Sequence, residues 1–185
     1  MKLNFIKSFS IFSIFLYFCG AEVTALAYTL STGENIFCDV TWKGKNIRVA
    51  EEYLGRIEGR TEPPVLGGSA AIIKYPPDKD PVIVFDVGVM FDVAQLLPLA
   101  TDFIFFHECA HIRYKTSDEF YTNCRAVVDM YDAGFLDQKQ FFLIEKYHHS
   151  MFRLPIKYGG AGFVFWEKTK RCLRKINHPL VSHDM

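Results

Sequence analysis

The sequence has no excess of either charge, because 21 Lys and Arg balance 21 Asp and Glu over 185 residues. Without a basic excess, nothing in the composition favours contact with phosphates, so nucleic-acid binding is not predicted. The chain also lacks internal repeats and low-complexity tracts. Half of its residues are hydrophobic and only 23% are charged. This profile excludes a disordered linker and is typical of one globular domain.

Only one apolar run is a candidate for a segment that spans a membrane, and it lies at the N-terminus. Lys2 and Lys7 precede an uncharged stretch, residues 8–21, whose apolar part is shorter than the 20 or so residues that a stable transmembrane helix needs. The stretch is typical of a secretory signal, and Ala25-Leu26-Ala27 offers a cleavage site before Tyr28. The alternatives are cleavage near Ala21 and an uncleaved N-terminal anchor.

We therefore expect residues 1–27 to be removed and residues 28–185 to form a single domain with no stable membrane span. Its location would be periplasmic or secreted. Removal of the signal leaves an even number of cysteines, for which we expect two disulfides. Three pairings are possible and a buried free thiol is an alternative. The four residues are Cys38, Cys109, Cys124 and Cys172.

Strand patterns come first along the chain and helical patterns follow. A hairpin is predicted over 36–53 around a glycine-containing turn, a Gly- and Pro-rich loop over 59–81 contains a possible strand at 70–75, and a β-branched strand covers 81–86. Helical character begins after Asp86. The fold class is therefore α+β, with a small N-terminal β-sheet followed by a helical core. The predicted helices cover 99–114, 117–133, 137–152 and 163–176, and a loose tail covers 177–185.

The central predicted helix contains an H-E-x-x-H pattern. Two histidines four positions apart, His107 and His111, lie on the same face of a helix and can bind one metal ion. Glu108 flanks that face, where it can hold a water molecule on the metal. Two imidazoles and a carboxylate suit zinc. In a sequence of this composition the pattern is expected roughly 0.01 times by chance, so it is a specific signal.

A third ligand must come from elsewhere in the chain. The three-histidine version of the pattern requires Gly at position 114 and His at position 117, where this chain has Tyr114 and Ser117. That version is excluded. The candidates that remain are Asp118, Glu119, His148 and His149.

The helix after the motif carries a second signal. It reads Glu119-Phe-Tyr-Thr-Asn-Cys-Arg-Ala126. In this it resembles zinc peptidases of the gluzincin type, in particular small exported bacterial ones, in which a helix of the form E-x-x-A-[DN]-x-x-A provides the third ligand. Glu119, Asn123 and Ala126 match, and Thr122 departs from the pattern. The resemblance implies a zincin-like helical core, zinc ligands His107, His111 and Glu119, and a substrate cleft bordered by the strand over 82–85.

Glu119 and Asn123 share a helix face, so Glu119 can bind the metal while Asn123 accepts a hydrogen bond from the far nitrogen of a ligand histidine. Two local alternatives remain open. Thr116 and Glu119 also have the spacing of a capping box, which would turn Glu119 toward its own helix. Asp118 is a possible ligand if the second helix approaches more closely.

The functional hypothesis is an exported zinc-dependent metallopeptidase that acts on a peptide or protein substrate. Glu108 would serve as the general base that takes a proton from the water on the zinc. The alternative is a catalytically weak or inactive metallopeptidase-like binding module, and a metal-free structural protein is a third possibility. Candidates for stabilising the oxyanion, which the sequence does not rank, are Tyr147, His148, His149, Arg153 and Tyr158.

Two other features have a structural interpretation. Cys109 lies inside the motif, but it is about 200° around the helix from His107, so it should face away from the metal and be available for packing or a disulfide. The last predicted helix has a basic face and an apolar stripe. We expect it to dock on the core with the basic face in solvent, and contact with an acidic surface is the alternative.

Overall fold

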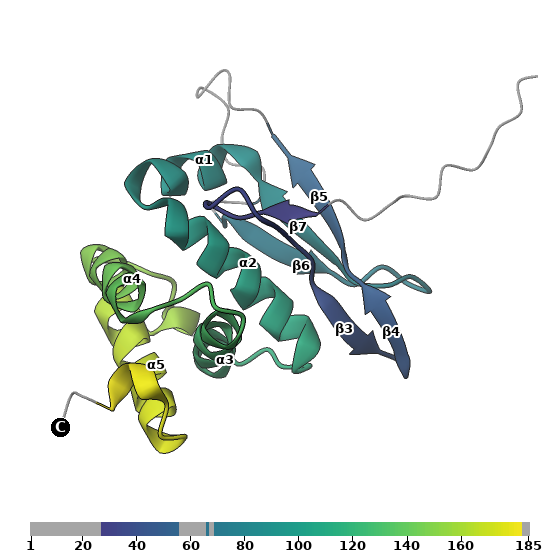
Figure 1. Ribbon diagram of the computed structural model, residues 1–185. Coiled ribbons are helices and arrows are strands. Elements are labelled where there is room, and N and C mark those ends of the chain that lie inside the picture. The colour runs from purple at the N-terminus through teal and green to yellow at the C-terminus, as the bar shows by residue number, and fades with distance from the viewer. Residues whose placement is uncertain (1–26, 56–65, 67–68, 183–185) are drawn as a thin grey trace, which may run out of the picture.

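The computed structural model describes residues 27–55, 66 and 69–182 (Figure 1). The predicted signal segment before Ala27 and much of the predicted loop over 59–81 lie outside these residues. Within the described ranges, no helix combines the length and the apolar character that crossing a membrane would require.

The strands form three small sheets. β1 (Tyr28–Thr29) pairs with β2 (Asn35–Ile36), and β3 (Asp39–Trp42) forms the expected hairpin with β4 (Lys45–Arg48). The next strand, β5, is not part of this hairpin but belongs to a different sheet. That sheet has the order β5-β7-β6, in which β5 is parallel and β6 antiparallel to the central β7. Its strands are β5 (Ala50–Leu54), β6 (Ala71–Lys74) and β7 (Val82–Asp86).

Helices follow the strands, which confirms the α+β class. The predicted helical character after Asp86 is a separate helix, α1, because Pro98 has no N–H to continue it and instead begins α2. Two short 3₁₀ helices occur near the C-terminus, η1 (Ile156–Tyr158) and η2 (Pro179–Val181). The α-helices are α1 (Val87–Leu96), α2 (Pro98–Arg113), α3 (Glu119–Asp132), α4 (Gln138–Ser150) and α5 (Gly162–Lys175).

Local side chains determine where these helices begin and end. Asp86, Asp118 and Asp137 accept hydrogen bonds from backbone N–H groups in the first turns of α1, α3 and α4. Gly134 follows α3 with a φ of +79°, as predicted for a glycine that ends a helix. At Gly162 a Cβ atom would lie 1.9 Å from the carbonyl oxygen of His148, so only glycine lets α5 begin this close to α4.

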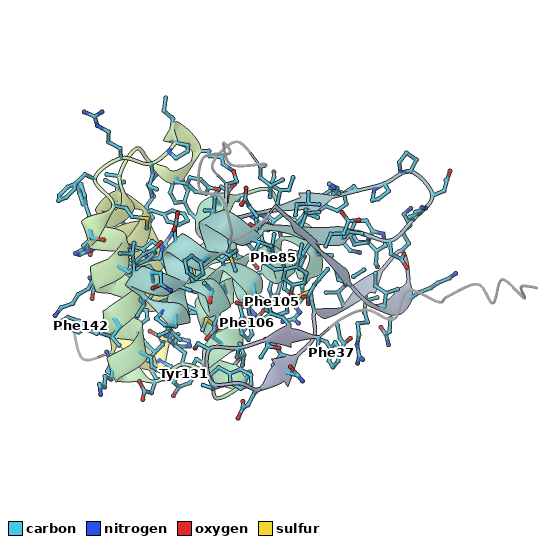
Figure 2. The ribbon with its side chains drawn as sticks, turned by 90° about the horizontal axis from the view of Figure 1, so that it is seen from above. Phe37, Phe85, Phe105, Phe106, Tyr131 and Phe142 are labelled. Carbon is cyan, nitrogen blue, oxygen red and sulfur yellow. A yellow bond between two sulfur atoms is a disulfide. The ribbon has the colours of Figure 1, made fainter. Side chains whose placement is uncertain are left out.

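Helix α2 runs through the middle of the molecule, with the strands on one side and α3, α4 and α5 on the other (Figure 1). Eleven of its sixteen residues are buried. Figure 2 shows Phe85 and Phe105 between the strands and the helices. Tyr28 stacks on Phe105 with ring centroids 4.5 Å apart, so the first described strand is part of the core.

The C-terminal segment corrects one prediction. Residues 177–182 are not a loose tail, because Leu180 and Val181 are buried in the core. The His178 Nδ1 atom accepts a hydrogen bond from the backbone N–H of Leu180, and its ring packs against Tyr131. Two apolar residues in a short polar segment gave too weak a signal to be recognised as an anchor.

All four cysteines of the predicted domain form disulfides, as expected. The sequence left the pairing open, and the structure pairs Cys38 with Cys109 and Cys124 with Cys172. Cys109 therefore faces the β3 side of α2, away from the histidines, as the helical spacing predicted. Two disulfides fit an exported protein, because oxidising compartments allow them to persist.

Glu51 on β5 is an acidic side chain with only 8% exposure. Its Oε2 atom accepts a hydrogen bond from the Tyr53 hydroxyl, and Oε1 has no partner in the protein. Burial raises the pKa of Glu51 to about 7, although the hydrogen bonds from Tyr53 and from the backbone of Tyr28 oppose this. The folded protein therefore favours the protonated carboxyl.

We expect Glu51→Gln to remove a pH dependence from the free energy of unfolding. The folded-state pKa lies above the ordinary value of 4.5, so Glu51 stabilises the fold below pH 4.5 and this contribution is lost as the pH rises through about 7. Between pH 4.5 and 8 the wild-type protein should lose on the order of 2–3 kcal/mol relative to the variant. Urea unfolding across this range measures the difference. Glu52→Gln, which removes the same charge from the exposed neighbour, should leave the wild-type pH profile in place.

Candidate metal centre

Helices α2 and α3 bring three potential metal ligands to one point. His107 and His111 lie one turn apart in the last half of α2, and Glu119 is the first residue of α3. The His107 Nε2 atom lies 3.1 Å from His111 Nε2 and 3.1 Å from Glu119 Oε2, and His111 Nε2 lies 3.3 Å from the same oxygen. These are the three residues that the sequence predicted as ligands, and together they have the make-up of a metal site.

The turn between the helices fixes the orientation of the His111 ring. Its Nδ1 atom lies 2.8 Å from the carbonyl oxygen of Thr116 and 3.1 Å from the hydroxyl oxygen of Thr122. The Thr122 hydroxyl donates its hydrogen to the carbonyl of Asp118, so toward His111 it can only accept. Both contacts therefore require Nδ1 to carry the proton. This leaves Nε2 as a bare lone pair directed at His107 and Glu119, as a metal ligand requires.

The spacing of the three atoms fits zinc. Ligands at about 2.0–2.1 Å from a tetrahedral zinc ion are separated by roughly 3.3–3.4 Å, which is close to the three observed distances. The same distances suit a hydrogen bond for only some of the pairs, because a bare His111 Nε2 and a carboxylate oxygen are both acceptors. A cation at the centre of the triangle would satisfy all three atoms.

The electrostatics of the cluster favour a positive charge within it. Burial would raise the pKa of Glu119, but the contacts with His107, His111 and Lys157 hold it well below its usual range. Burial also opposes a charged imidazole at His111, yet the contacts with Glu119 and the Thr116 carbonyl outweigh it and raise the His111 pKa. The carboxylate is thus kept ionised next to two imidazoles in a partly buried site.

Lys157 is a contact of the site that the sequence did not reveal. It lies on η1, 38 positions after Glu119, and its ammonium donates a hydrogen bond of 2.7 Å to Glu119 Oε1. The two oxygens of Glu119 therefore face different partners, with Oε2 toward the histidines and Oε1 toward Lys157. Sequence patterns carry no signal for a contact made by a surface loop at such a separation.

The prediction that Asn123 accepts a hydrogen bond from a histidine of the site is wrong. Its amide nitrogen donates to the hydroxyl of Thr169 on α5 at 2.6 Å, and its Oδ1 atom is buried without a partner. The far nitrogen of His111 instead contacts Thr116 and Thr122. Thr122 is the position that departs from the gluzincin pattern, so the departing residue takes over part of the orienting role expected of Asn123.

The two local alternatives for this region are also wrong. Asp118 is not a ligand, because its carboxylate caps α3 by accepting hydrogen bonds from the backbone of Phe120 and Tyr121. Thr116 does not form a capping box with Glu119, since its hydroxyl accepts from the backbone N–H of Asp118. The Glu119 side chain therefore makes no capping-box contact with the start of its own helix, and it faces the histidines.

Glu108 lies where two cavities meet. A larger cavity of about 340 Å³ includes His107, and a smaller one of about 210 Å³ includes His111 and Glu119. Glu108 and Tyr158 line both. Burial raises the pKa of Glu108, and the positive charges that His107 and His111 can carry lower it part of the way back. The predicted general base thus borders both the cavity of the potential ligands His111 and Glu119 and the larger cavity.

The two cavities are lined by β6 and not by the strand over 82–85, which the resemblance implied as the border of a substrate cleft. Ala71 lines both cavities, and Ile72 and Ile73 line the smaller one. β7, which contains residues 82–85, is the central strand of its sheet and is covered by β6 on this side. The sequence pattern identified a buried strand correctly but gave no information about strand order.

The structure separates the five oxyanion candidates. Tyr158 lines both cavities, and Tyr147 and His148 line the larger one. His148 is buried and stacks on Trp166, and burial lowers its pKa to about 4, so it is a neutral ring at ordinary pH. His149 and Arg153 are exposed and line neither cavity.

A second group of potential ligands, Glu145, His149 and Glu167, lies on α4 and α5. Lys170 donates to Glu145 at 2.6 Å and to Glu167 at 2.7 Å, so an ammonium already pairs with both carboxylates. This arrangement does not favour a cation.

Comparison with known proteins does not extend this assignment, since no protein family, curated protein or solved structure matches the chain.

We expect the purified protein to contain one equivalent of zinc, and His111→Ala to abolish it because the variant removes one of three ligand atoms. Elemental analysis after extensive dialysis measures the metal content. The matched control is His149→Ala, which removes an exposed histidine and should leave the zinc content at one. A wild-type protein without metal, or a variant that keeps the full equivalent, would contradict the assignment.

Proposed function

We propose that the protein is an exported zinc metallopeptidase that hydrolyses peptide bonds in peptide or protein substrates. The observation that carries this proposal is the convergence of His107 Nε2, His111 Nε2 and Glu119 Oε2 within 3.3 Å of one another, beside a partly buried glutamate. A bound zinc ion would supply a Lewis acid for the scissile carbonyl and lower the pKa of the attacking water.

The protein groups have distinct tasks in this reaction. Glu108 accepts a proton from the attacking water and later delivers it to the departing amine, a double role that suits a carboxylate whose pKa is raised by burial. Tyr158 borders the same space, and burial raises the pKa of its phenol, which keeps the hydroxyl protonated. It can therefore donate a hydrogen bond to the developing oxyanion.

Strand β6 provides a means of holding an extended substrate. Its partner β7 lies on one side, and no other strand pairs with it among the residues that the structure describes. Ile72 and Ile73 line the cavity that contains Glu108 and Glu119. A peptide added to this edge by main-chain hydrogen bonds would pass the proposed centre without requiring a particular sequence.

Glu108→Gln should lower kcat for peptide hydrolysis by about 10²–10⁴-fold, because an amide cannot accept the proton from the attacking water. The zinc content should stay at one equivalent, since Glu108 is not a ligand in this proposal. Cleavage of unfolded protein substrates, followed by mass spectrometry of the products, measures the effect. Glu52→Gln is the charge-matched control and should retain full activity.

The same measurement separates the alternative function. Zinc-loaded wild-type protein without detectable hydrolysis of any substrate would favour a metallopeptidase-like binding module. Hydrolysis that persists undiminished in Glu108→Gln would contradict the proposed role of this residue.

Tyr158→Phe should lower kcat by roughly 10–100-fold with little change in KM, because a hydrogen bond to the oxyanion strengthens only in the transition state. Tyr147→Phe is the matched control, since Tyr147 lines the larger cavity but not the one that contains Glu119. Steady-state kinetics on one synthetic peptide compares the two. Equal effects of the two substitutions would refute a specific role for Tyr158.

A further inference from the structure

Charge is strongly segregated along the chain. Residues 28–137 contain ten Lys and Arg against seventeen Asp and Glu, a net charge of −7. Residues 138–176, which comprise α4, the connecting loop and α5, contain nine against two, a net charge of +7. The two acids of this second segment, Glu145 and Glu167, both pair with Lys170. The protein is therefore neutral overall, but the segment over 138–176 is strongly basic. We call this segment the basic end.

The loop that joins α4 to α5 exposes large apolar side chains at this basic end. Phe152 is 86% exposed and Ile156 is 92% exposed, and Arg153 and Lys157 lie next to them in the sequence. In the described part of the chain these are the two most exposed large hydrophobic side chains. Helix α4 also has an apolar side chain next to a basic one, since the Lys146 Nζ atom lies 4.6 Å from the centre of the Phe142 ring.

The loop is fastened in this conformation by its other residues. The backbone N–H of Leu154 donates to the carbonyl of Gly160, and that of Gly162 donates to Met151. Lys157 is bonded to Glu119. Met151, Leu154 and Tyr158 face inward and line the larger cavity. Because these three residues occupy the inward side of the loop, Phe152 and Ile156 are left exposed.

We propose that this protein docks on the surface of anionic phospholipid bilayers through the loop Met151–Tyr158, with Phe152 and Ile156 entering the interfacial region. Lipid headgroups supply the negative charge that the basic end lacks, and the acyl boundary beneath them accepts apolar side chains. Nucleic acid would also match the positive charge, but it has no apolar layer that could accept the exposed side chain of Ile156. The inference is independent of the proposed enzymatic function, and it places a loop that lines the larger cavity at the membrane surface.

The charge contribution should depend on distance from the loop. Arg153 lies in the loop and Lys146 lies in the last part of α4, which leads into it. Lys175 is thirteen residues beyond the start of α5, roughly 20 Å along the helix axis. Lys139 is at the corresponding far end of α4, roughly 16 Å away. Both distances exceed the screening length of about 8 Å at physiological salt. Lys139 and Lys175 thus form a charge-matched control for Lys146 and Arg153.

The experiment uses the full chain as isolated after export, with its N-terminus determined by mass spectrometry. Sedimentation with vesicles of neutral phosphatidylcholine is compared with vesicles containing about 30% phosphatidylglycerol, near physiological salt. We expect binding to the anionic vesicles only. Phe152→Ser with Ile156→Ser should weaken it at least tenfold, whereas Leu96→Ser, which removes a side chain that is 77% exposed in the acidic part of the chain, should not.

Reversal of the two proximal charges, Lys146→Glu with Arg153→Glu, should also weaken binding at least tenfold, and Lys139→Glu with Lys175→Glu less than threefold. Circular dichroism and thermal unfolding verify that each variant is folded. Failure of the wild-type protein to bind anionic vesicles would overturn the proposal, as would equal effects of the proximal and distal pairs. Binding to duplex DNA, or self-association in sedimentation velocity, without vesicle binding would assign the basic end to those partners instead.

Discussion

Burial of helix α2 on nearly every side is the constraint on which the rest of the structure depends. A helix that lies between a sheet and three other helices must either be apolar all round or satisfy each polar group it carries. α2 does the second. Asp102 accepts hydrogen bonds from the backbone and the hydroxyl of Ser31, and the two histidines meet Glu119, Thr116 and Thr122. The polar groups of α2 thereby determine which segments pack around it.

The position of α3 relative to α2 follows from this requirement. Asp129 on α3 accepts hydrogen bonds from Arg113 and Tyr114 at the end of α2, at 2.6 and 2.7 Å. With the turn at Thr116 and the cap at Asp118, these contacts fix where the first residue of α3 lies. Glu119 therefore reaches the histidines by way of a short, hydrogen-bonded turn, an arrangement that would preorganise the proposed metal site.

Helical spacing in the sequence was enough to predict the core of the site, because the i, i+4 relation of His107 and His111 does not depend on the rest of the fold. The third residue, Glu119, required the resemblance to a known pattern, and its position near the histidines is confirmed. Contacts that depend on tertiary packing were beyond reach. The hydroxyl of Thr169 turns Asn123 away from the histidines, Lys157 approaches from a loop, and strand order placed β6 rather than β7 at the cleft.

The segment between α4 and α5 connects features that would otherwise be separate. Its inward residues line the larger cavity, Lys157 contacts Glu119, and its outward residues form the exposed apolar tip. A displacement of the loop would therefore change the shape of the cavity and the environment of one candidate ligand together. The close approach at Gly162 limits such motion, because α5 begins against the carbonyl of His148.

The disulfides have a practical consequence for producing the protein. Cys38–Cys109 joins residues 71 positions apart and attaches the motif helix to the strand layer, and the closure of so long a loop is worth about 4 kcal/mol in the chain-entropy view. Cys124–Cys172 does the same for α3 and α5. Recombinant expression in a reducing cytosol would leave four thiols to be accommodated in the interior, so a host compartment with oxidative folding machinery is the appropriate choice for obtaining native material.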